Sequence, residues 1–142
     1  MRIQTFQSSD EAAVIALWEA CGLVRPWNDP KKDIARKLKI QPELFLVMTE
    51  GEAIVGSVMA GYEGHRGWIN YLAVAPEEQG RGLGRRLMEE AEVRLRALGC
   101  PKINLQVRTS NEAVRQFYKS IGYQLDEVVS FGKRLEHDEP PV

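Results

Sequence analysis

The chain has 142 residues with 19 basic and 20 acidic side chains, which give a formal net charge of −1. This length is typical of one domain, and an apolar fraction of 44% is enough to build a core without disulfides or a metal. A nearly neutral chain has no overall positive field to attract nucleic acid or an acidic membrane, so we expect neither as a partner.

The N-terminal part of the chain predicts one strand and two helices. Residues 2–6 predict a strand because they alternate, whereas residues 8–22 have the apolar spacing of a helix. After the loop that follows, Asp29 is a candidate cap for a second helix with a proline in its first position. Ile34 and Leu38 are expected on the inner face of this helix.

The middle of the chain predicts a meander of three strands, at residues 44–50, 53–63 and 68–75, joined by short turns. A glycine-rich loop comes next and leads into a long helix that extends to about residue 98. The apolar stripe of this helix is expected to be buried and consists of Leu83, Leu87, Ala91, Leu95 and Leu98.

The C-terminal part predicts a strand at residues 102–107, a helix at residues 110–122 and a last hairpin over residues 123–135. Residues 137–142 are expected to form a polar tail behind a single domain at residues 1–136. Hairpins joined to crossover helices imply an α/β (α+β) fold. The sheet would be mixed, mostly antiparallel, with about four flanking helices.

Neither the cysteines nor the start of the chain indicate an exported protein. Cys21 and Cys100 are far apart in the sequence and are interpreted as buried thiols rather than as a disulfide or a redox pair. No secretory signal and no apolar run of the roughly 20 residues that span a bilayer is evident, so a cytoplasmic protein is expected if the source is bacterial. No clustering of His and Cys predicts a metal site.

The stretch "EEQGRGLGRRL" at residues 77–87 places three glycines at every second position between a strand and a helix. Its spacing differs from the G-x-G-x-x-G of dinucleotide-binding folds and from the G-x-x-x-x-G-K-[ST] of P-loops. The free N–H groups of a helix N-terminus still favour an anion, and glycines let a ligand approach the backbone. The stretch is therefore interpreted as a pyrophosphate site held mainly by main chain, with added charge from Arg81, Arg85 and Arg86.

Two motifs resemble those of the GNAT superfamily of N-acetyltransferases. Gln79, Gly82 and Gly84 match the signature [QR]-x-x-G-x-[GA] after a strand. The stretch "NEAVRQFYKSIGY" at residues 111–123 is similar to N-x-x-A-x-x-[FL]-Y-x-x-x-G-[FY], except that Val114 stands at the alanine position. Several loop stretches further resemble the small YpeA-like bacterial subfamily.

The resemblance implies that the glycine loop binds the pyrophosphate of acetyl-CoA, the acetyl donor. It also implies that the strand at residues 68–75 splays from the strand at residues 102–107 at a β-bulge. The pantetheine arm would pair with the open strand as an added strand. The residues that the resemblance assigns to cofactor binding are Leu72, Val74, Gln79, Gly80, Arg81, Gly82, Leu83, Gly84, Arg85 and Asn111.

Tyr118 is the candidate catalytic residue. Acyl transfer from a thioester expels a thiolate whose acid has a pKa of about 8.5, and a phenol within hydrogen-bond reach can protonate or stabilise that sulfur. The spacing of Tyr118 by itself is also typical of a core tyrosine on an amphipathic helix. The motif around it favours the role of general acid.

The sequence does not show a general base at the positions that the resemblance suggests. Some family members carry a glutamate on the strand before the glycine loop or on the next strand, where this chain has Trp68 and Gln106. One interpretation is proton removal through water to Glu63, His65 or Asp29. The other is an acceptor that needs little help, such as an α-amine with a pKa of about 7.7–8.0 instead of about 10.4 for lysine.

The acceptor site is expected near the loop between the first two helices. Trp27 offers an apolar wall there, while Asn28 and Asp29 offer polar groups. A capping turn accounts for Asp29 equally well, and Glu63 and His65 in the turn "YEGHRG" are further candidates.

The function that follows is an acetyl-CoA-dependent N-acetyltransferase without a metal. It would acetylate a small-molecule or peptide amine by direct attack in a ternary complex. The alternative is a catalytically weak acyl-CoA-binding module that acts as a regulator or sensor. The last predicted hairpin is a candidate edge for a homodimer.

Overall fold

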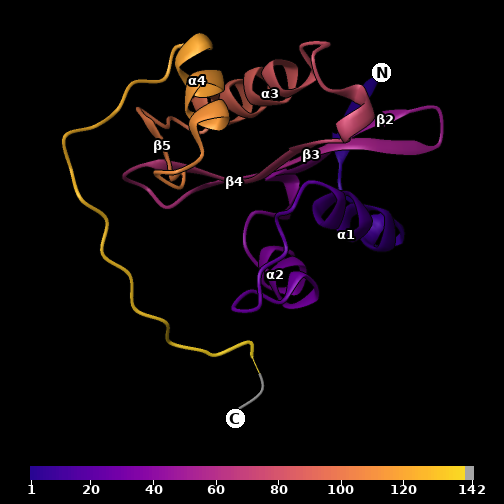
Figure 1. Ribbon diagram of the computed structural model, residues 1–142, viewed down its shortest axis with the longest axis horizontal. Helices are drawn as coiled ribbons and strands as arrows, with labels where there is room; N and C mark the ends of the chain where they lie inside the picture. Colours follow the sequence, from indigo (N-terminus) through magenta and orange to yellow (C-terminus); the bar gives the residue numbers. More distant parts are fainter. Residues whose placement is uncertain (140–142) are drawn as a thin grey trace.

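The computed structural model describes residues 1–139 and forms a five-stranded sheet with helices on both faces (Figure 1). The strands are β1 (Arg2–Thr5), β2 (Phe45–Glu50), β3 (Ala53–Tyr62), β4 (Gly67–Val74) and β5 (Ile103–Leu105). The α-helices are α1 (Glu11–Ala20), α2 (Pro30–Lys37), α3 (Leu83–Ala97) and α4 (Glu112–Ser120). Short 3-10 helices lie at η1 (Ser8–Asp10), η2 (Pro42–Leu44) and η3 (Pro76–Glu78).

The sheet has the order β1-β2-β3-β4-β5, and its neighbouring strands are antiparallel except for the parallel pair β4–β5. This pair is parallel because α3 carries the chain from the end of β4 back to the start of β5. The α/β class and the mixed, mostly antiparallel sheet predicted from the sequence are thus confirmed.

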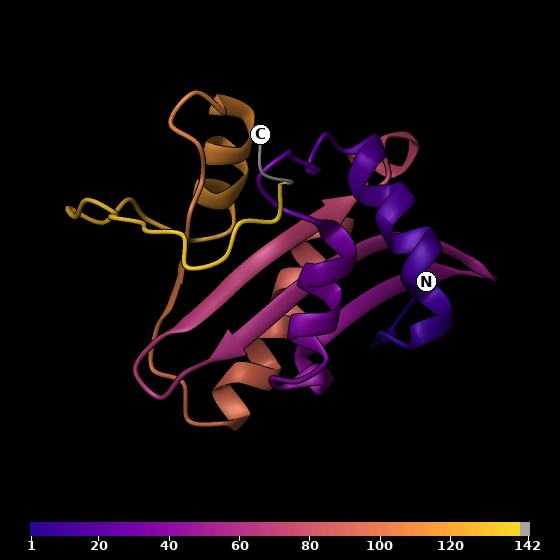
Figure 2. The same cartoon turned by 90° about the horizontal axis from the view of Figure 1, so that it is seen from below.

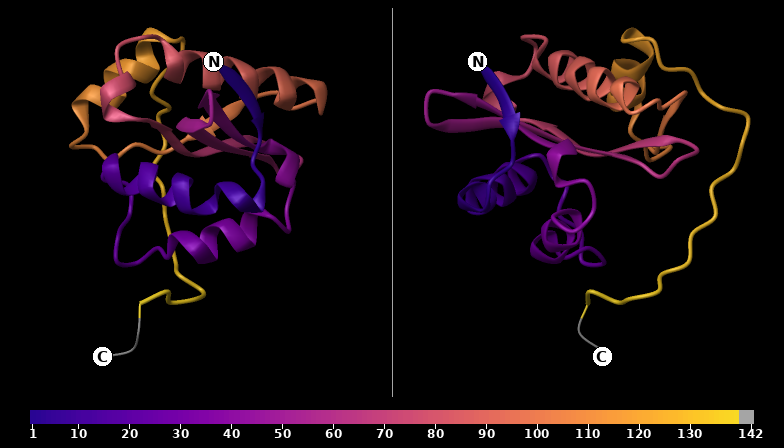
Figure 3. Two further views of the ribbon diagram at one scale, coloured as in Figure 1. Left: turned by 90° about the vertical axis from the view of Figure 1, so that its right-hand side faces the viewer. Right: turned by 180° about the vertical axis from the view of Figure 1, so that it is seen from behind.

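The helices form two layers. α1 and α2 cover one face of the sheet, and α3 and α4 lie on the opposite face (Figure 1; right panel of Figure 3). The first layer buries Trp18 and Ile34 against Phe45, and the second buries Leu87 against Val58 and its neighbours. β2 and β3 are therefore buried on both faces, which fits their continuous apolar runs. No helix within residues 1–139 is long and apolar enough to cross a membrane.

Two apolar residues at helix ends are more exposed than predicted. Leu38 and Leu98 were expected on buried faces, but they are 37% and 49% exposed. Each is the C-cap of its helix, α2 or α3, rather than a residue within the last turn. The helical spacing of apolar residues directs a side chain toward the core only within the helix. The prediction therefore fails for the last apolar residue of each stripe, where the helix has ended.

The C-terminal part differs most from the prediction. β5 is shorter than the expected strand at residues 102–107, because its pairing with β4 ends early. Residues 123–139 contain no strand, so the hairpin expected over residues 123–135 is wrong. The segment instead runs beside β5, swings outward and reaches α2 (Figures 1 and 2). Residues 140–142, the end of the expected polar tail, lie outside the described residues.

Candidate active site

β4 and β5 separate halfway along β4. They pair between Gly67–Ile69 and Ile103–Leu105, while β4 continues to Val74. The second half of β4 therefore has an edge that β5 does not cover. The predicted splay is present, and its open edge leads into the glycine loop.

A β-bulge in β4 lies at the start of this open edge. Tyr71 has a φ of 52°, and the register between β3 and β4 shifts between Ser57 and Met59. The Trp18 indole donates a hydrogen bond to the Ser57 hydroxyl (2.9 Å), which donates to the Tyr71 carbonyl (2.8 Å). The rings of Trp18 and Tyr71 also stack with centroids 3.8 Å apart. These contacts hold a left-handed φ that is unusual for a non-glycine residue, and the bulge leaves nearby peptide groups such as that of Leu72 out of regular pairing.

The side chain of Tyr71 connects the bulge to α2. Its hydroxyl donates a hydrogen bond to the carboxylate of Asp33 over 2.6 Å. Burial and this carboxylate raise the pKa of Tyr71 well above its ordinary value. The phenol is therefore protonated at neutral pH and ties β4 to the first turn of α2.

Val74 presents its main chain to the open side of β4. The N–H of Ala75 donates to Val55 of β3 (2.8 Å), so the Val74 carbonyl in the same peptide points the other way. That carbonyl accepts hydrogen bonds from the Gln79 side chain (3.0 Å) and the Cys21 thiol (3.2 Å). The two lone pairs of the carbonyl are therefore engaged, which leaves the N–H of Val74 as the group available to a ligand.

The glycine loop leads into an N-terminus of α3 that carries no side-chain cap. Gly80 and Gly82 have φ values of 84° and 76°, which favour glycine, and Gly82 is the N-cap. No acidic residue lies in the first turn, so its N–H groups and the helix dipole remain free to attract an anion. Arg81 forms an ion pair with Glu78. Arg85 likewise pairs with Glu89, so the charges of these two arginines are partly balanced at this loop.

Gly84 allows α3 and α4 to approach each other closely. A Cβ at this position would lie 3.2 Å from Cζ of Phe117 and 3.7 Å from Val74. β4, α3 and α4 therefore meet at Gly84. The α4 residue at this contact, Phe117, directly precedes the candidate residue Tyr118. The third glycine of the loop has a packing role, whereas Gly80 and Gly82 shape the turn.

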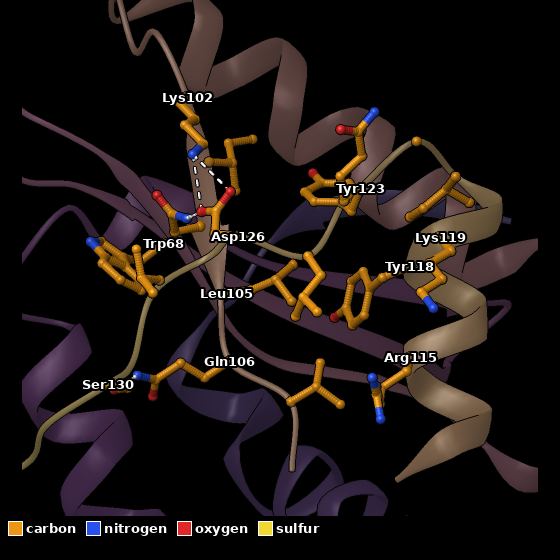
Figure 4. A pocket seen from close by; sticks show the side chains of 18 of the residues that line it. Trp68, Lys102, Leu105, Gln106, Arg115, Tyr118, Lys119, Tyr123, Asp126 and Ser130 are labelled. Carbon is orange, nitrogen blue, oxygen red and sulfur yellow. Dashed lines mark hydrogen bonds and ion pairs between the residues drawn. The ribbon is translucent and has the colours of Figure 1, made fainter. Parts of the chain in front are cut away.

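Tyr118 lies on α4 and is 8% exposed (Figure 4). It lines a cavity of about 1710 Å³ between α4, β5 and the C-terminal segment. It makes no side-chain hydrogen bond among the described residues, yet its hydroxyl is not a buried unpaired atom, so the hydroxyl is accessible. Burial raises the pKa of Tyr118 to about 12, which keeps the phenol protonated at neutral pH.

The loop between α1 and α2 contains the expected acceptor residues. Asp29 caps α2 by accepting hydrogen bonds from the N–H groups of Lys31 (2.9 Å) and Lys32 (3.2 Å), which confirms the capping turn. The Asn28 side chain accepts from Arg134 (3.0 Å). The guanidinium of Arg108 lies over the ring of Trp27, with its Cζ atom 5.3 Å from the ring centroid. All three residues are thus in contact with other parts of the chain, and their acceptor role stays a prediction.

Glu63 and His65 lie in the turn between β3 and β4, at the end of β4 that pairs with β5. At about 3.3 Å per residue of strand, this turn is roughly 20 Å from Leu72. The N–H groups of Arg66 and His65 donate to Glu63 and lower the pKa of its carboxyl group. The structure therefore does not bring these two candidates to the open edge of β4.

Most of the chain matches a single family description, "acetyltransferase (GNAT) family", over residues 9–123. The chain belongs to the GNAT family. An acetyltransferase of Yersinia enterocolitica is 51% identical over 139 residues, which cover 98% of this chain and 99% of the relative. One of Pectobacterium atrosepticum is 50% identical over 138 residues, which cover 97% and 98% of the two chains. The protein is therefore an acetyltransferase.

Solved structures of other acetyltransferases share the fold at low sequence identity. A putative acetyltransferase from Agrobacterium tumefaciens has a TM-score of 0.76 at 20% identity and covers 94% of this chain and 100% of its own. The ribosomal-protein-S18-alanine N-acetyltransferase from Escherichia coli has a TM-score of 0.71 at 23% identity, covering 85% and 76%. An aminoglycoside antibiotic 6'-N-acetyltransferase from Acinetobacter haemolyticus has a TM-score of 0.73 at 17% identity, covering 96% and 100%.

Trp68 and Gln106 stand where some GNAT family members carry a glutamate, and both line the same cavity as Tyr118. Trp68 lies on β4 opposite Gly61 and is 36% exposed. The amide of Gln106 donates a hydrogen bond to the Ser130 hydroxyl (Figure 4). Neither side chain is a base. Residues 1–139 also contain no group of three or more His, Cys, Asp or Glu that could hold a metal ion.

Asn111 acts as the N-cap of α4 in this GNAT chain. Its side-chain oxygen accepts a hydrogen bond from the N–H of Val114 (3.2 Å). The role in cofactor binding that the sequence assigned to Asn111 stays a prediction, as it does for Gln79 and the residues of the glycine loop.

Sequence reasoning missed the residues that build the bulge of this GNAT site: Trp18, Ser57 and Tyr71, together with Asp33. The strand sequence "WINYLAVA" contains neither glycine nor proline at the bulge. No local signal therefore marks the left-handed residue, because contacts from α1 and β3 impose it.

Proposed function

We propose that this acetyltransferase takes its acetyl group from acetyl-CoA and transfers it to a primary amine. The observation that carries the proposal is the continuous surface formed by the open edge of β4 and the uncapped N-terminus of α3. A main-chain edge suits the amide groups of a pantetheine arm, and the helix N-terminus suits a pyrophosphate. Tyr118 lies on the neighbouring α4, whose Phe117 touches the glycine loop at Gly84.

The donor would bind mainly to main chain. The N–H group of Val74 faces the open edge of β4, and that of Leu72 lies next to this edge. The N–H groups of residues 80–85 surround the start of α3. Acetyl-CoA supplies the activated thioester. The protein then orients it, and a backbone N–H near Leu72 can stabilise negative charge on the thioester oxygen.

Direct attack in a ternary complex is favoured because neither cysteine is suited to form an acyl-enzyme intermediate. An acyl-enzyme would require a thiolate, but burial raises the pKa of the Cys21 thiol, which donates a hydrogen bond to the Val74 carbonyl. Cys100 lies between α3 and the start of β5, at the end of α3 opposite to the glycine loop. Neither cysteine is therefore suited to carry the acetyl group.

The acceptor would be an amine that loses its proton easily. Trp68 and Gln106 offer no carboxylate, and Glu63 has a lowered pKa in a remote turn. An α-amine has a pKa of about 7.7–8.0, so a much larger fraction is neutral at pH 7 than for a lysine side chain at about 10.4. We therefore expect a small molecule or peptide with such an amine to react faster than a lysine side chain.

Two measurements test the proposal together. Acetyl-CoA at about 100 times its Kd adds about 2.7 kcal/mol of stability, which raises the Tm by roughly 5–10 °C for a domain of this size, whereas NAD and ATP at equal concentration do not. Release of free CoA is then followed with dipeptides, a polyamino sugar and Nα-acetyl-lysine. We expect turnover with at least one of the first two acceptors.

The outcomes separate the two functions that the sequence left open. Tight binding of acetyl-CoA without turnover on any amine would support an acyl-CoA sensor instead of an enzyme that acts on these amines. Absence of a Tm shift with acetyl-CoA would contradict the donor assignment. A rate on Nα-acetyl-lysine that exceeds the rate on dipeptides would contradict the preference for a low-pKa amine.

A further inference from the structure

Polar side chains alternate with apolar ones along β5 and the residues that follow it. Leu105 and Val107 pack against the core on the α3 side of the sheet. Side chains of an extended chain point alternately to the two faces, so Asn104, Gln106 and Arg108 point to the face that carries α1 and α2. Figure 4 shows Leu105 and Gln106 on opposite sides of the strand.

The α1 and α2 face of the sheet is open over β5 and the first part of β4. The two helices pack over β2 and β3, where Met59 belongs to their core. Asn70 is opposite Met59 and thus shares its face, but Asn70 and Trp68 are exposed. Trp68 and Gln106 line the cavity next to Tyr118 (Figure 4). A molecule on this face would therefore reach the separation of β4 and β5 from the side opposite to α3.

Arg108 is held at the border of this open face by an aromatic ring. Its Cζ atom lies 5.3 Å from the ring centroid of Trp27, which belongs to the loop between α1 and α2. This contact places Arg108 on the open face independently of the strand alternation. A guanidinium stacked on an indole keeps its N–H edge available, and that edge matches the two oxygens of a carboxylate.

The cavity beside Arg108 is basic, although the chain as a whole has a net charge of −1. Five basic and two acidic side chains line it: Arg96, Lys102, Arg108, Arg115 and Lys119, with Glu92 and Asp126. Lys102 pairs with Asp126, Arg115 pairs with Glu112, and Arg96 and Lys119 belong to α3 and α4. Among residues 1–139, Arg108 is thus the basic side chain of this cavity that faces the open side without an ion pair. Such a group favours an anionic ligand.

The register of the sheet places Arg108 close to the point of reaction. β4 and β5 pair from Gly67 with Ile103 to Ile69 with Leu105. Continuation of this register brings Arg108 about level with Leu72. Paired strands are about 4.8 Å apart, and the gap is wider here because the two strands have separated. A dipeptide spans about 7 Å from its amine to its carboxylate, so it can connect the two sides of this gap.

We propose that Arg108, positioned by Trp27, binds the carboxylate of a short peptide or amino acid whose α-amine accepts the acetyl group. This inference rests on the N-acetyltransferase function proposed above and names the acceptor class. The neutral amine nitrogen bonds to the acetyl carbon, the C–S bond breaks, the nitrogen loses one proton and CoA leaves as its thiol. Arg108 takes part by fixing the far end of the acceptor.

Two acceptors that differ only in the carboxylate test the proposal. L-alanyl-L-alanine and its C-terminal amide have the same α-amine, but only the first can pair with Arg108. We expect wild-type kcat/KM to be about tenfold or more higher for the free dipeptide. Arg108→Gln should lower this value about 10–100-fold, as for the loss of hydrogen bonds between charged groups, and should leave the amide within about twofold.

Further variants separate binding of the carboxylate from other effects. Trp27→Ala should raise KM for the free dipeptide while kcat and the values for the amide change little, and Trp27→Phe should restore most of the loss. Arg2→Gln, at an exposed arginine on β1 at the other edge of the sheet, is the matched control and should change neither acceptor. The KM for acetyl-CoA should stay constant in Arg108→Gln, and a clear rise would assign Arg108 to the donor and overturn the proposal.

Calorimetric titration of the two peptides into protein saturated with CoA measures binding without turnover. Tighter binding of the free dipeptide that is lost in Arg108→Gln supports the carboxylate site even if no acetyl group is transferred, which distinguishes it from the proposed enzymatic function. Equal affinity and equal rate for the two peptides in the wild type would overturn the proposal. The absence of binding by either peptide, or a preference that persists in Arg108→Gln, would overturn it as well.

Discussion

At the scale of single residues, the environment of Tyr118 defines what its hydroxyl can do. Burial raises its pKa to about 12, whereas a free thiol has a pKa of about 8.5. Complete proton transfer from this phenol to a thiolate is therefore unfavourable, and donation of a hydrogen bond to the sulfur is favoured. The phenol is protonated throughout the neutral range, so the donor is always present.

Tyr118→Phe should lower kcat about 100-fold, as expected for the loss of one hydrogen bond to the negative charge that develops on the sulfur, while the Kd for acetyl-CoA changes little. The packing should survive because the hydroxyl makes no hydrogen bond among the described residues. Steady-state kinetics and calorimetric titration measure the two quantities. Tyr62→Phe, in which the lost hydrogen bond is to Gly64 in a remote turn, is the matched control.

An unchanged kcat in Tyr118→Phe with intact acetyl-CoA binding would exclude the acid role. The pH profile gives a second check. Because the pKa of Tyr118 is about 12, kcat should show no inflection from this residue between about pH 6 and pH 9. An inflection in that range that disappears in Tyr118→Phe would show that the residue titrates in the neutral range.

At the scale of elements, the bulge in β4 determines which peptide groups face the open edge. Ser57 is fully buried and connects the Trp18 indole to the Tyr71 carbonyl. α1, β3 and β4 therefore meet at one hydroxyl group. The conformation of Tyr71 depends on all three elements being in place.

Ser57→Ala should lower the free energy of unfolding by about 1–3 kcal/mol, because it leaves the buried N–H of Trp18 without an acceptor. The KM for acetyl-CoA should also rise, since the bulge loses one of its supports. Chemical denaturation and steady-state kinetics measure these changes. Ser120→Ala removes an exposed hydroxyl at the end of α4 and should change neither quantity substantially.

If Ser57→Ala is destabilised but its KM for acetyl-CoA stays at the wild-type value, the bulge does not contribute to binding of the acetyl donor.

The sequence predicts the elements whose signals are local. The glycine loop and α3 are recognisable because the turn glycines, the apolar stripe and the terminal Gly99 lie within one short stretch. Tyr71 could not be recognised, since its left-handed φ is imposed by Trp18 and Ser57 from other elements. The capping role of Asp29 is confirmed, because it depends on contacts only two and three residues away, whereas its acceptor role stays a prediction.

The failure at residues 123–135 has a different cause. Alternation of apolar residues indicates that a segment can form a strand, but a strand exists only where a partner accepts its backbone hydrogen bonds. Within residues 1–139 no strand pairs with this segment. The alternation therefore indicates only that the segment could pair as a strand, and the predicted hairpin does not form.

At the scale of the whole molecule, Asp138, near the end of the described residues, contacts the helical layer on the opposite side of the sheet from α4. The side chain of Asp138 is 1% exposed and binds Arg36 over 2.6 Å. It also accepts a hydrogen bond from the N–H of Asp29 over 2.9 Å. Figure 3 shows the segment crossing from one layer to the other. The hydrogen bonds from Arg36 and Asp29 lower the pKa of Asp138 well below its usual range.

Because the pKa of Asp138 is depressed in the folded state, this anchor contributes fully above the ordinary carboxyl pKa of about 3.9 and is lost as the pH falls through the depressed value. Hydrogen exchange at the Asp29 amide should show constant protection from pH 7 to about pH 5 and reduced protection in strong acid. Asp138→Ala should reduce the protection already at pH 7, whereas Glu139→Ala should not.

Equal protection of the Asp29 amide in wild type and Asp138→Ala would show that the contact between Asp138 and Asp29 does not persist in solution.

Because β5 pairs only with the first part of β4, the second part of β4 has no neighbouring strand on that edge. A bound molecule that hydrogen-bonds along β4 would become part of the hydrogen-bonded framework, and the chain could open there only after releasing it. The resistance of this protein to cellular proteases would then follow the local supply of that molecule. A shortage would shorten the lifetime of the protein before any product of its reaction became scarce.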